Sequence, residues 1–293
     1  MRKAWKWSTT GYSFVHRAPE EILALCCRAR LGGLEVAPPL FADQAPSAQQ
    51  RLAAQFRAAG VVLDSYHLPF AAEDDIASFY ETVRRRAVDN MLRHMERAAL
   101  LGCRVVIQHP STSRYDAGLE GLDNYLRQAS RSLETLLPRA GELGLKIAVE
   151  NMLPGETTAA GTPGERFGSR PEHLARLAAQ LPHPALGFCL DTGHALVAGS
   201  PAGAHGFFAA MQPRLVAFHL ADNAGDRDSH LAPGHGLVDW HTLFRAVAAL
   251  GYAECMCIEA APFAYGPNLS QPVEAWVQMV DDTEALAAAA LAD

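Results

Sequence analysis

The segment ERAALLGCRVVIQH, residues 96–109, contains the pattern that decides the fold. Its first half, rich in alanine and leucine, is typical of a helix. Gly102 stands where such a helix would stop, because glycine accepts a left-handed backbone that other residues resist. The apolar residues that follow do not alternate with polar ones, so the expected strand is buried on both faces, as in a parallel sheet.

The same order of helix, glycine and strand recurs along the chain, at Gly60, Gly144 and Gly251. Counting the apolar runs gives eight expected strands, at residues 4–9, 33–37, 61–67, 104–109, 146–151, 186–191, 215–220 and 255–259, and a last alanine-rich helix at about 271–291. Eight strand–helix units without a linker predict one domain, residues 1–293, folded as an α/β TIM barrel of the (β/α)8 type. A doubly wound open sheet is the alternative, but no G-x-G-x-x-G follows the first strand.

Composition limits the class of protein. The 293-residue chain is 49% hydrophobic and 19% charged, which is enough apolar material for a large core. Its formal net charge of −7 argues against a general nucleic-acid binder, since such domains usually carry a basic face. We find no signal peptide and no run of roughly 18 apolar residues that would span a membrane. The six cysteines form no C-x-x-C pair, so we expect a cytoplasmic protein with reduced thiols.

Residue types that bind metals stand at the carboxyl ends of the expected strands. The residues at the strand ends are His67, His109, Glu150, Asp191, His219 and Glu259, and His194 lies three residues after Asp191. The loop after the seventh strand adds Asp228, His230 and His235. Each of these residues, taken singly, could have a structural role instead of binding a metal, for example as a hydrogen-bonded histidine or as a helix cap. In a closed barrel, however, all strand ends meet at one mouth, and such a crowd of desolvated acids and imidazoles is costly without a cation. The sequence therefore predicts a bound divalent metal.

Two other chemistries found in α/β enzymes are not expected. A Schiff-base enzyme needs a lysine at the open mouth of the barrel. This chain has only Lys3, Lys6 and Lys146, and Lys146 begins its strand at the closed end. Nucleophilic serine chemistry is not expected either, because the sequence contains no G-x-S-x-G turn.

Several motifs resemble the xylose-isomerase-like superfamily of barrels, and within it the branch of sugar phosphate isomerases and epimerases. The motifs are V-x-I-x-H-P at residues 105–110, A-V-E-N-M at 148–152, C-L-D-T-G-H at 189–194, F-H-L-x-D-N at 218–223, H-L-x-P-G-x-G-x-V-D-W at 230–240 and I-E-A at 258–260. They span nearly the whole chain in order. The resemblance implies a single divalent ion (Zn, Mn, Co or Mg) bound by Glu150, Asp191, His219 and Glu259, with His194 beside it on the substrate.

The resemblance also implies an activity. A carbohydrate, with or without a phosphate, would be isomerised or epimerised by proton transfer through a metal-stabilised enediolate, with Glu150 and Glu259 as the catalytic pair. Trp240, His235 and Arg227 are expected to contact the substrate, although for Trp240, as for Trp5 and Phe70, core packing is the preferred interpretation. The loop residues Arg114, Arg166 and Arg170 are further candidates. We expect neither nucleic acid nor a membrane as partner, and leave a homo-oligomer open.

Three alternatives stay open. Endonuclease-IV-like barrels bind up to three zinc ions, and the further ligand positions of that group are matched by His67, His109, His194, Asp228 and His230. A phosphodiesterase acting on abasic DNA is therefore the main rival, although that family has Asp-Arg-His where this chain has Asp-Ser-His at residues 228–230. A dehydratase of the inosose or dehydroshikimate type would use the same site, and a metal- and sugar-binding protein without catalysis is least favoured. The epimerases also have Gly-Glu-Gly where residues 234–236 are Gly-His-Gly.

Overall fold

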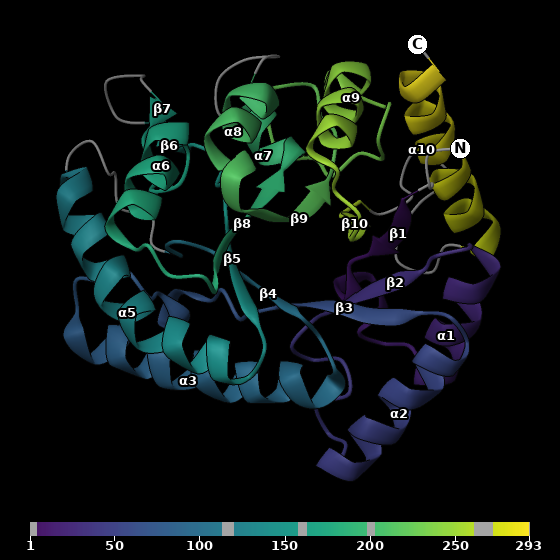
Figure 1. Cartoon of the computed structure of the whole chain (residues 1–293), viewed down its shortest axis with the longest axis horizontal. Helices are drawn as coiled ribbons and strands as arrows, with labels where there is room; N and C mark the ends of the chain where they lie inside the picture. The colour runs from purple at the N-terminus through teal and green to yellow at the C-terminus, as the bar shows by residue number, and fades with distance from the viewer. Residues whose placement is uncertain (1–4, 113–119, 158–162, 198–202, 261–271, 293) are drawn as a thin grey trace.

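The computed structural model describes residues 5–112, 120–157, 163–197, 203–260 and 272–292, and its strands lie in the centre with helices around them (Figure 1). The main sheet has eight parallel strands in the order β1-β10-β9-β8-β5-β4-β3-β2. Its two outermost strands, β1 (Lys6–Thr9) and β2 (Gly33–Val36), are joined by a parallel bridge between Thr10 and Glu35. The sheet closes on itself, and the expected (β/α)8 TIM barrel is confirmed.

The strands agree closely with those expected from the sequence. The other six are β3 (Val62–His67), β4 (Val105–Gln108), β5 (Lys146–Glu150), β8 (Leu186–Asp191), β9 (Leu215–Leu220) and β10 (Cys255–Ile258). The helices are α1 (Pro19–Arg28), α2 (Pro46–Ala58), α3 (Glu81–Leu101), α5 (Leu122–Glu142), α6 (Pro171–Gln180), α7 (Thr192–Val197), α8 (Gly203–Met211), α9 (Trp240–Leu250) and α10 (Val273–Ala292). The last of these is the C-terminal helix expected at about 271–291.

The glycines predicted to stop helices adopt the left-handed backbone. Gly102 and Gly251 follow α3 and α9 directly, with φ of 82° and 75°. The same conformation occurs at Gly60 and Gly144, where φ is 85° and 71°. A short antiparallel hairpin of β6 (Gly155–Thr157) and β7 (Pro163–Gly164) was not expected, because strands of two or three residues are too short to produce a periodic pattern.

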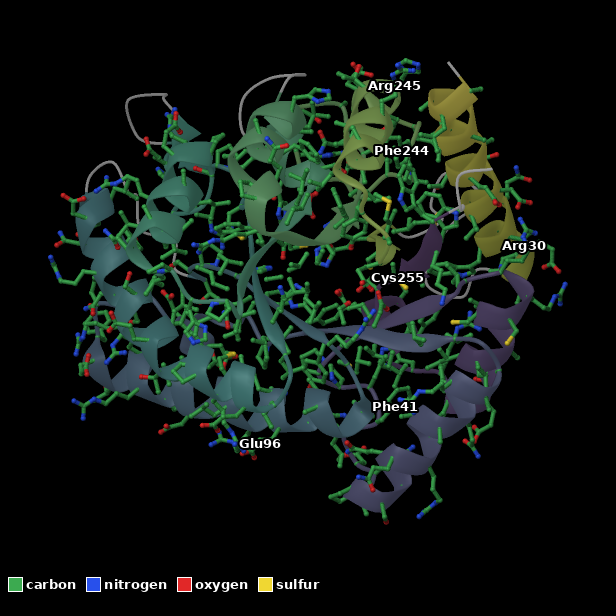
Figure 2. The ribbon with its side chains drawn as sticks, viewed as in Figure 1. Arg30, Phe41, Glu96, Phe244, Arg245 and Cys255 are labelled. Carbon is green, nitrogen blue, oxygen red and sulfur yellow. The ribbon has the colours of Figure 1, made fainter. Side chains whose placement is uncertain are left out.

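The buried hydrophobic residues form two clusters. The larger cluster lies between barrel and helices and includes Phe41 and Phe244, while charged residues such as Arg30 and Arg245 point outward (Figure 2). The smaller cluster consists of Ile107, Ala148, Cys189 and Ala217. Because alternate residues of a strand face opposite sides, these four line the barrel interior. Most of them are small, so the interior is not filled by large branched side chains.

The structure also bears on the cysteines, on membrane-spanning helices and on Lys146. All six cysteines are free thiols. Within the described ranges, no helix combines the length and the apolar character that crossing a membrane would require. Lys146 begins β5 and is exposed at the closed end of the barrel, as expected from the sequence.

Candidate active site and metal centre

The open end of the barrel holds a cavity of about 450 Å³. The residues lining it include seven of the predicted site residues: His67, His109, Glu150, His194, Asp228, His230 and Glu259. His67 and Glu150 are the last residues of β3 and β5, while His109 and Glu259 stand one residue beyond β4 and β10. Strand ends in a barrel converge, and here they bring side chains that are far apart in sequence to one place.

Four side chains form what we call the central group. One donor atom from each of Glu150, Asp191, His219 and Glu259 lies within 4.8 Å of the other three. His219 Nδ1 is 2.7 Å from Glu259 Oε2 and 3.2 Å from Glu150 Oε1. These are the four residues that the sequence analysis expected to share one divalent ion.

Two further groups flank the central one. In the first, Glu150 Oε2 lies 3.3 Å from His109 Nε2 and 3.7 Å from His67 Nε2. In the second, Asp228 Oδ2 lies 3.0 Å from His230 Nε2 and 3.4 Å from His194 Nε2. Glu150 thus faces the central group with one oxygen and the first flanking group with the other.

Backbone carbonyls fix which ring nitrogen carries the proton in three of the histidines. Nδ1 of His67 lies 2.8 Å from the carbonyl of Leu68, and Nδ1 of His230 lies 2.8 Å from the carbonyl of Glu259. His194 Nδ1 is 2.9 Å from the carbonyl of Asn151. A carbonyl only accepts, so each Nδ1 carries a proton and each Nε2 is left facing a carboxylate. This is the hydrogen-bonding pattern of metal-ligating histidines.

Burial and opposite charges set the protonation of the cluster. Burial alone would raise the pKa of Glu150, but the nearby histidines hold it well below its usual value. Burial would lower the pKa of His219, His194 and His230, yet neighbouring acidic side chains raise all three, to about 10 for His194 and His230. For Asp191, burial dominates and raises the pKa to about 7. Without a metal, protons on the histidines balance the carboxylates.

The donor set fits a divalent ion such as Zn²⁺, Mn²⁺ or Co²⁺. Glu150 Oε2 and Asp191 Oδ2 are buried and accept no hydrogen bond from the described part of the chain. A buried carboxylate oxygen without a hydrogen bond is costly, and a metal ion supplies a contact in its place. Imidazole combined with carboxylate suits these three ions, whereas Mg²⁺ prefers oxygen ligands.

Metal affinity is expected to rise with pH. Because the pKa values of His194 and His230 are raised to about 10, a metal ion binding there has to displace protons. Each displaced proton increases the affinity about tenfold per pH unit below that pKa. We therefore expect the Zn²⁺ affinity, measured by competition with a chromogenic chelator, to increase at least about tenfold from pH 6.5 to pH 7.5. An affinity that stays constant over this range would show that these histidines are not ligands.

A residue that the sequence analysis missed, Glu35, supports the central group. It lies in β2 and is 1% exposed. Its Oε2 is 3.1 Å from His219 Nε2 and accepts a 2.7 Å hydrogen bond from the Ser65 hydroxyl. A carboxylate behind a ligating histidine fixes the ring's tautomer and orientation, so that Nδ1 of His219 faces the central group. The feature of the sequence that could have revealed Glu35 is its charge inside an otherwise apolar strand.

Asp222 organises the loop after β9. Its Oδ2 accepts hydrogen bonds from Trp240 Nε1 at 2.8 Å and from the backbone N–H of Gly234 at 3.1 Å. Its Oδ1 accepts two more, from the backbone N–H groups of Val238 at 3.1 Å and Asn223 at 3.0 Å. A Cβ on Gly236 would lie 2.3 Å from Asp222 Oδ1, so only glycine fits there. Trp240 is 4% exposed and packs in the core. Trp240 is not among the described residues that line the cavity, and its burial agrees with the preferred core-packing interpretation.

Replacing Asp222 by asparagine is expected to lower the free energy of unfolding by about 2–4 kcal/mol. The amide nitrogen cannot accept a hydrogen bond, so one pair of N–H donors loses its acceptor whichever way the amide is placed. The measurement is urea denaturation. Asp226→Asn, an exposed change in the same loop, is the control and should stay within about 0.5 kcal/mol of the wild type. Equal effects of the two substitutions would contradict the assigned role.

The other expected substrate contacts are placed as follows. His235 and Arg227 are exposed and are not among the described residues that line the cavity. Arg166 does line it, as does Phe70, whose ring is stacked 4.8 Å from that of His109. Two candidates remain: Arg170 forms a 3.0 Å ion pair with Glu165, and Arg114 lies outside the described residues. Trp5 packs against Trp7 and Phe244 before the first strand, away from the mouth.

The sequence relatives include uncharacterized proteins and proteins named endonuclease 4. An uncharacterized protein of Methanocaldococcus jannaschii is 30% identical over 200 residues, which cover 66% of this chain and 62% of the relative. Endonuclease 4 of Thermus thermophilus is 35% identical over 163 residues, covering 51% of this chain and 52% of the relative. The chain therefore matches less than two thirds of the length of these relatives.

Solved structures resemble the chain over nearly its whole length. A D-tagatose 3-epimerase-like protein has a TM-score of 0.76 at 23% identity, with 98% of each chain covered. An IOLI protein with a binding zinc atom has a TM-score of 0.73 at 16% identity, with 95% of this chain and 96% of the other covered. At these identities the likeness establishes the fold.

A family profile covers most of the sequence. It describes a xylose isomerase-like TIM barrel and matches residues 25–281, which include every residue of the central and flanking groups. The match agrees with the eight-stranded barrel and with the motifs at its strand ends. The chain belongs to the xylose isomerase-like TIM barrel family.

Proposed function

We propose that the protein is a divalent-metal-dependent isomerase or epimerase acting on a small carbohydrate. The observation that carries the proposal is the convergence of Glu150, Asp191, His219 and Glu259 beside one cavity of about 450 Å³. A cavity of this volume suits a small molecule. Support also comes from the fold, which is shared by a D-tagatose 3-epimerase-like protein and a D-psicose 3-epimerase.

Glu150 and Glu259 are the residues that would move the proton. They project from β5 and after β10, so they reach the substrate from different sides. Although burial would raise the pKa of both, the neighbouring histidines hold it low, at about 2 for Glu259, so both are ionised when substrate arrives. One takes a proton from the carbon next to a carbonyl. The other, after receiving a proton from water, delivers it to the opposite face or to the neighbouring carbon, and the first then returns its own proton to water. When bound, a divalent ion supplies Lewis-acid polarisation of the substrate oxygens.

The rest of the cavity would position the substrate. Tyr12 and Phe70 form one wall, with ring centroids 5.6 Å apart. Arg166 and Thr10 offer polar groups to hydroxyl or phosphate oxygens. Such a combination of aromatic and polar surfaces is common in carbohydrate-sized pockets, because the ring faces and the hydroxyl groups of a sugar need different partners.

The test is incubation of the metal-loaded protein with a panel of ketoses, inososes and dehydroshikimate in deuterated water. Deuterium incorporated at carbon, with an isomer as product, is the expected result. A product that has lost water would identify a dehydratase instead. A panel that takes up no deuterium would overturn the proposal.

A second candidate, hydrolysis of a phosphodiester, is favoured by one observation. Glu150 presents its two oxygens to two different histidine groups, and Asp228 holds a third group together. Such an arrangement supplies ligands for more than one metal ion, as hydrolytic sites with several metals require. The relatives named endonuclease 4 support this candidate, whereas the net charge of −7 opposes DNA binding. Two or three zinc ions per chain together with nicking of an abasic duplex would establish it.

A further inference from the structure

A second cavity, of about 500 Å³, enters the barrel from its closed end. Its mouth is lined by residues at strand starts, among them Lys146 and Leu215, and by Gly144 and Gly251, which have no side chain to close it. Its inner end reaches Glu35. The volume is that of a small-molecule site, whereas large branched side chains fill the interior of most TIM barrels.

The walls of this cavity are largely apolar. Val105, Val216, Ala217 and Phe218 line it. Ala217 belongs to the cluster of small residues inside the barrel, and their size leaves the space unfilled. Such walls favour the hydrocarbon part of a ligand, because its contact with water is removed there.

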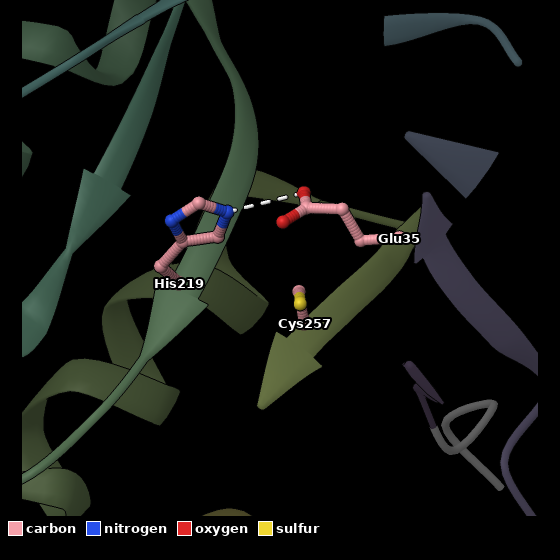
Figure 3. Close-up of side chains that lie close together, drawn as sticks. All are labelled: Glu35, His219 and Cys257. Carbon is pink, nitrogen blue, oxygen red and sulfur yellow. Dashed lines mark hydrogen bonds and ion pairs between the residues drawn. The ribbon is translucent and has the colours of Figure 1, made fainter. Parts of the chain in front are cut away.

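Glu35 brings an unsatisfied oxygen to the inner end of the cavity. Its Oε2 already contacts His219 Nε2 and the Ser65 hydroxyl. Its Oε1 is buried and accepts no hydrogen bond from the residues that the structure describes. Figure 3 shows one oxygen of Glu35 joined to the His219 ring and the other joined to none of the residues drawn. A buried carboxylate oxygen in this state is costly, so a donor from outside the described chain is expected beside it.

Asp64 adds a second acid to the lining of the same cavity. The Ser8 hydroxyl donates a 3.1 Å hydrogen bond to its Oδ2. The Cys255 thiol lies beside its Oδ1, because a Cβ on Gly33 would be 2.8 Å from that oxygen and 3.0 Å from the sulfur. A thiol is only a weak donor. Burial and then the charge of Glu35 raise the pKa of Asp64 to about 7, so a positive charge in the cavity would stabilise both acids.

The described lining residues bring no positive side chain to this inner end. Arg104 precedes β4 at the mouth, is 68% exposed and is paired with Glu254. Lys146 begins β5 and is exposed as well. The cavity therefore has basic groups outside, apolar walls, and acids inside.

We propose that this cavity binds a small aliphatic amine in its protonated form, with the ammonium group hydrogen-bonded to Glu35 Oε1 and attracted by the charge of Asp64. The alkyl part of the amine lies against the apolar walls. An ammonium group offers three N–H donors and a full charge, whereas a neutral hydroxyl offers one donor and no charge. Attraction by Asp64 needs no direct contact, since charges inside a protein interact over several ångströms. The site does not depend on which reaction the open end catalyses.

The test is isothermal titration calorimetry of the full-length protein with n-butylammonium chloride at pH 8. At this pH an alkylamine is protonated and Asp64 is ionised. The protein is first loaded with Mn²⁺, a weak binder of amines, so that the acids of the central group do not compete. We expect saturable binding with a dissociation constant of about 1 mM or lower, which is within reach of so small a ligand. n-Butanol, which has a similar shape but no charge, should bind at least about tenfold more weakly.

Two variants locate the bound amine. Asp64→Asn should weaken butylammonium binding about tenfold, because it removes a charge and keeps the size of the side chain. It also removes the repulsion with Glu35, so its urea midpoint should not fall below that of the wild type. Ala217→Leu keeps both acids but fills part of the apolar wall, and it should abolish binding. The exposed change Asp226→Asn is the control and should bind as the wild type does.

Three outcomes would overturn the proposal. The first is no saturable binding by the wild type up to about 10 mM butylammonium, which would mean that the cavity holds only water. The second is equal affinity for butanol, and the third is undiminished binding in Asp64→Asn. If Asp64→Asn is unfolded by circular dichroism, unchanged binding in Ala217→Leu decides against the site. Deuterium exchange into substrate tests the proposed reaction separately, so the two failures are distinguishable.

Discussion

Glu150→Gln is expected to reduce kcat/KM by at least about 10⁴-fold while leaving the barrel folded. The substitution removes the charge but keeps the size of the side chain, so the buried position stays filled. It removes an oxygen from the central group and places an amide where His109 and His67 now face a carboxylate. Both the base and the shared metal ligand are lost at once, and the two losses act on the same step.

The matched control for this change is Glu172→Gln, an exposed glutamate in the first turn of α6. It should leave kcat/KM within about twofold of the wild type, because it touches no part of the cavity. Circular dichroism and the urea midpoint of both variants report on folding. A Glu150→Gln enzyme with nearly normal turnover would show that the catalytic pair has been assigned wrongly.

Removing the divalent ions is the second change with a large expected effect. An ion present at a thousand times its dissociation constant stabilises the folded state by about 4 kcal/mol, and chelation takes this away. The loss is expected because protons on the histidines then have to balance the buried carboxylates of Glu150, Asp191 and Glu259. Thermal unfolding with and without chelator measures the stability, and turnover should fall to background in the same samples. Zn²⁺, Mn²⁺ or Co²⁺ should restore both quantities better than Mg²⁺.

Two histidine variants show whether the central group causes this stabilisation. His219→Asn removes a ligand of the central group and should abolish most of the metal-dependent shift in Tm. His241→Asn changes an exposed histidine of α9 and should keep it. A shift of the same size in both variants would mean that the ions stabilise the protein from another site.

The barrel could be predicted because its strands are short, apolar and preceded by glycine. Leu186–Asp191 and Leu215–Leu220 have the predicted ends. The metal-binding types at strand ends could be placed together for a geometric reason, since closing the sheet brings every carboxyl end to one mouth. This geometric argument does not say which atoms coordinate an ion. The roles of Glu150, Asp191, His219 and Glu259 as ligands therefore stay predictions.

What could not be predicted depends on partners distant in sequence. Glu35 was overlooked because its value lies in the contact with His219, on a strand far along the chain. The role of Trp240 depends on an indole hydrogen bond to Asp222, and the sequence motif carries no sign of its direction. Asp64 is left out of the pairing of β3 with β2 by a shift in register and accepts a hydrogen bond from Ser8 of β1, and a one-residue irregularity leaves no periodic signal.

The bridge from Thr10 to Glu35 that closes the sheet has one more consequence. The residue that fastens the first strand to the second is also the one that braces His219. An ion bound by that imidazole is therefore expected to stabilise the contact between the first two strands. Through Glu35, loss of the ion and separation of these strands are expected to favour each other.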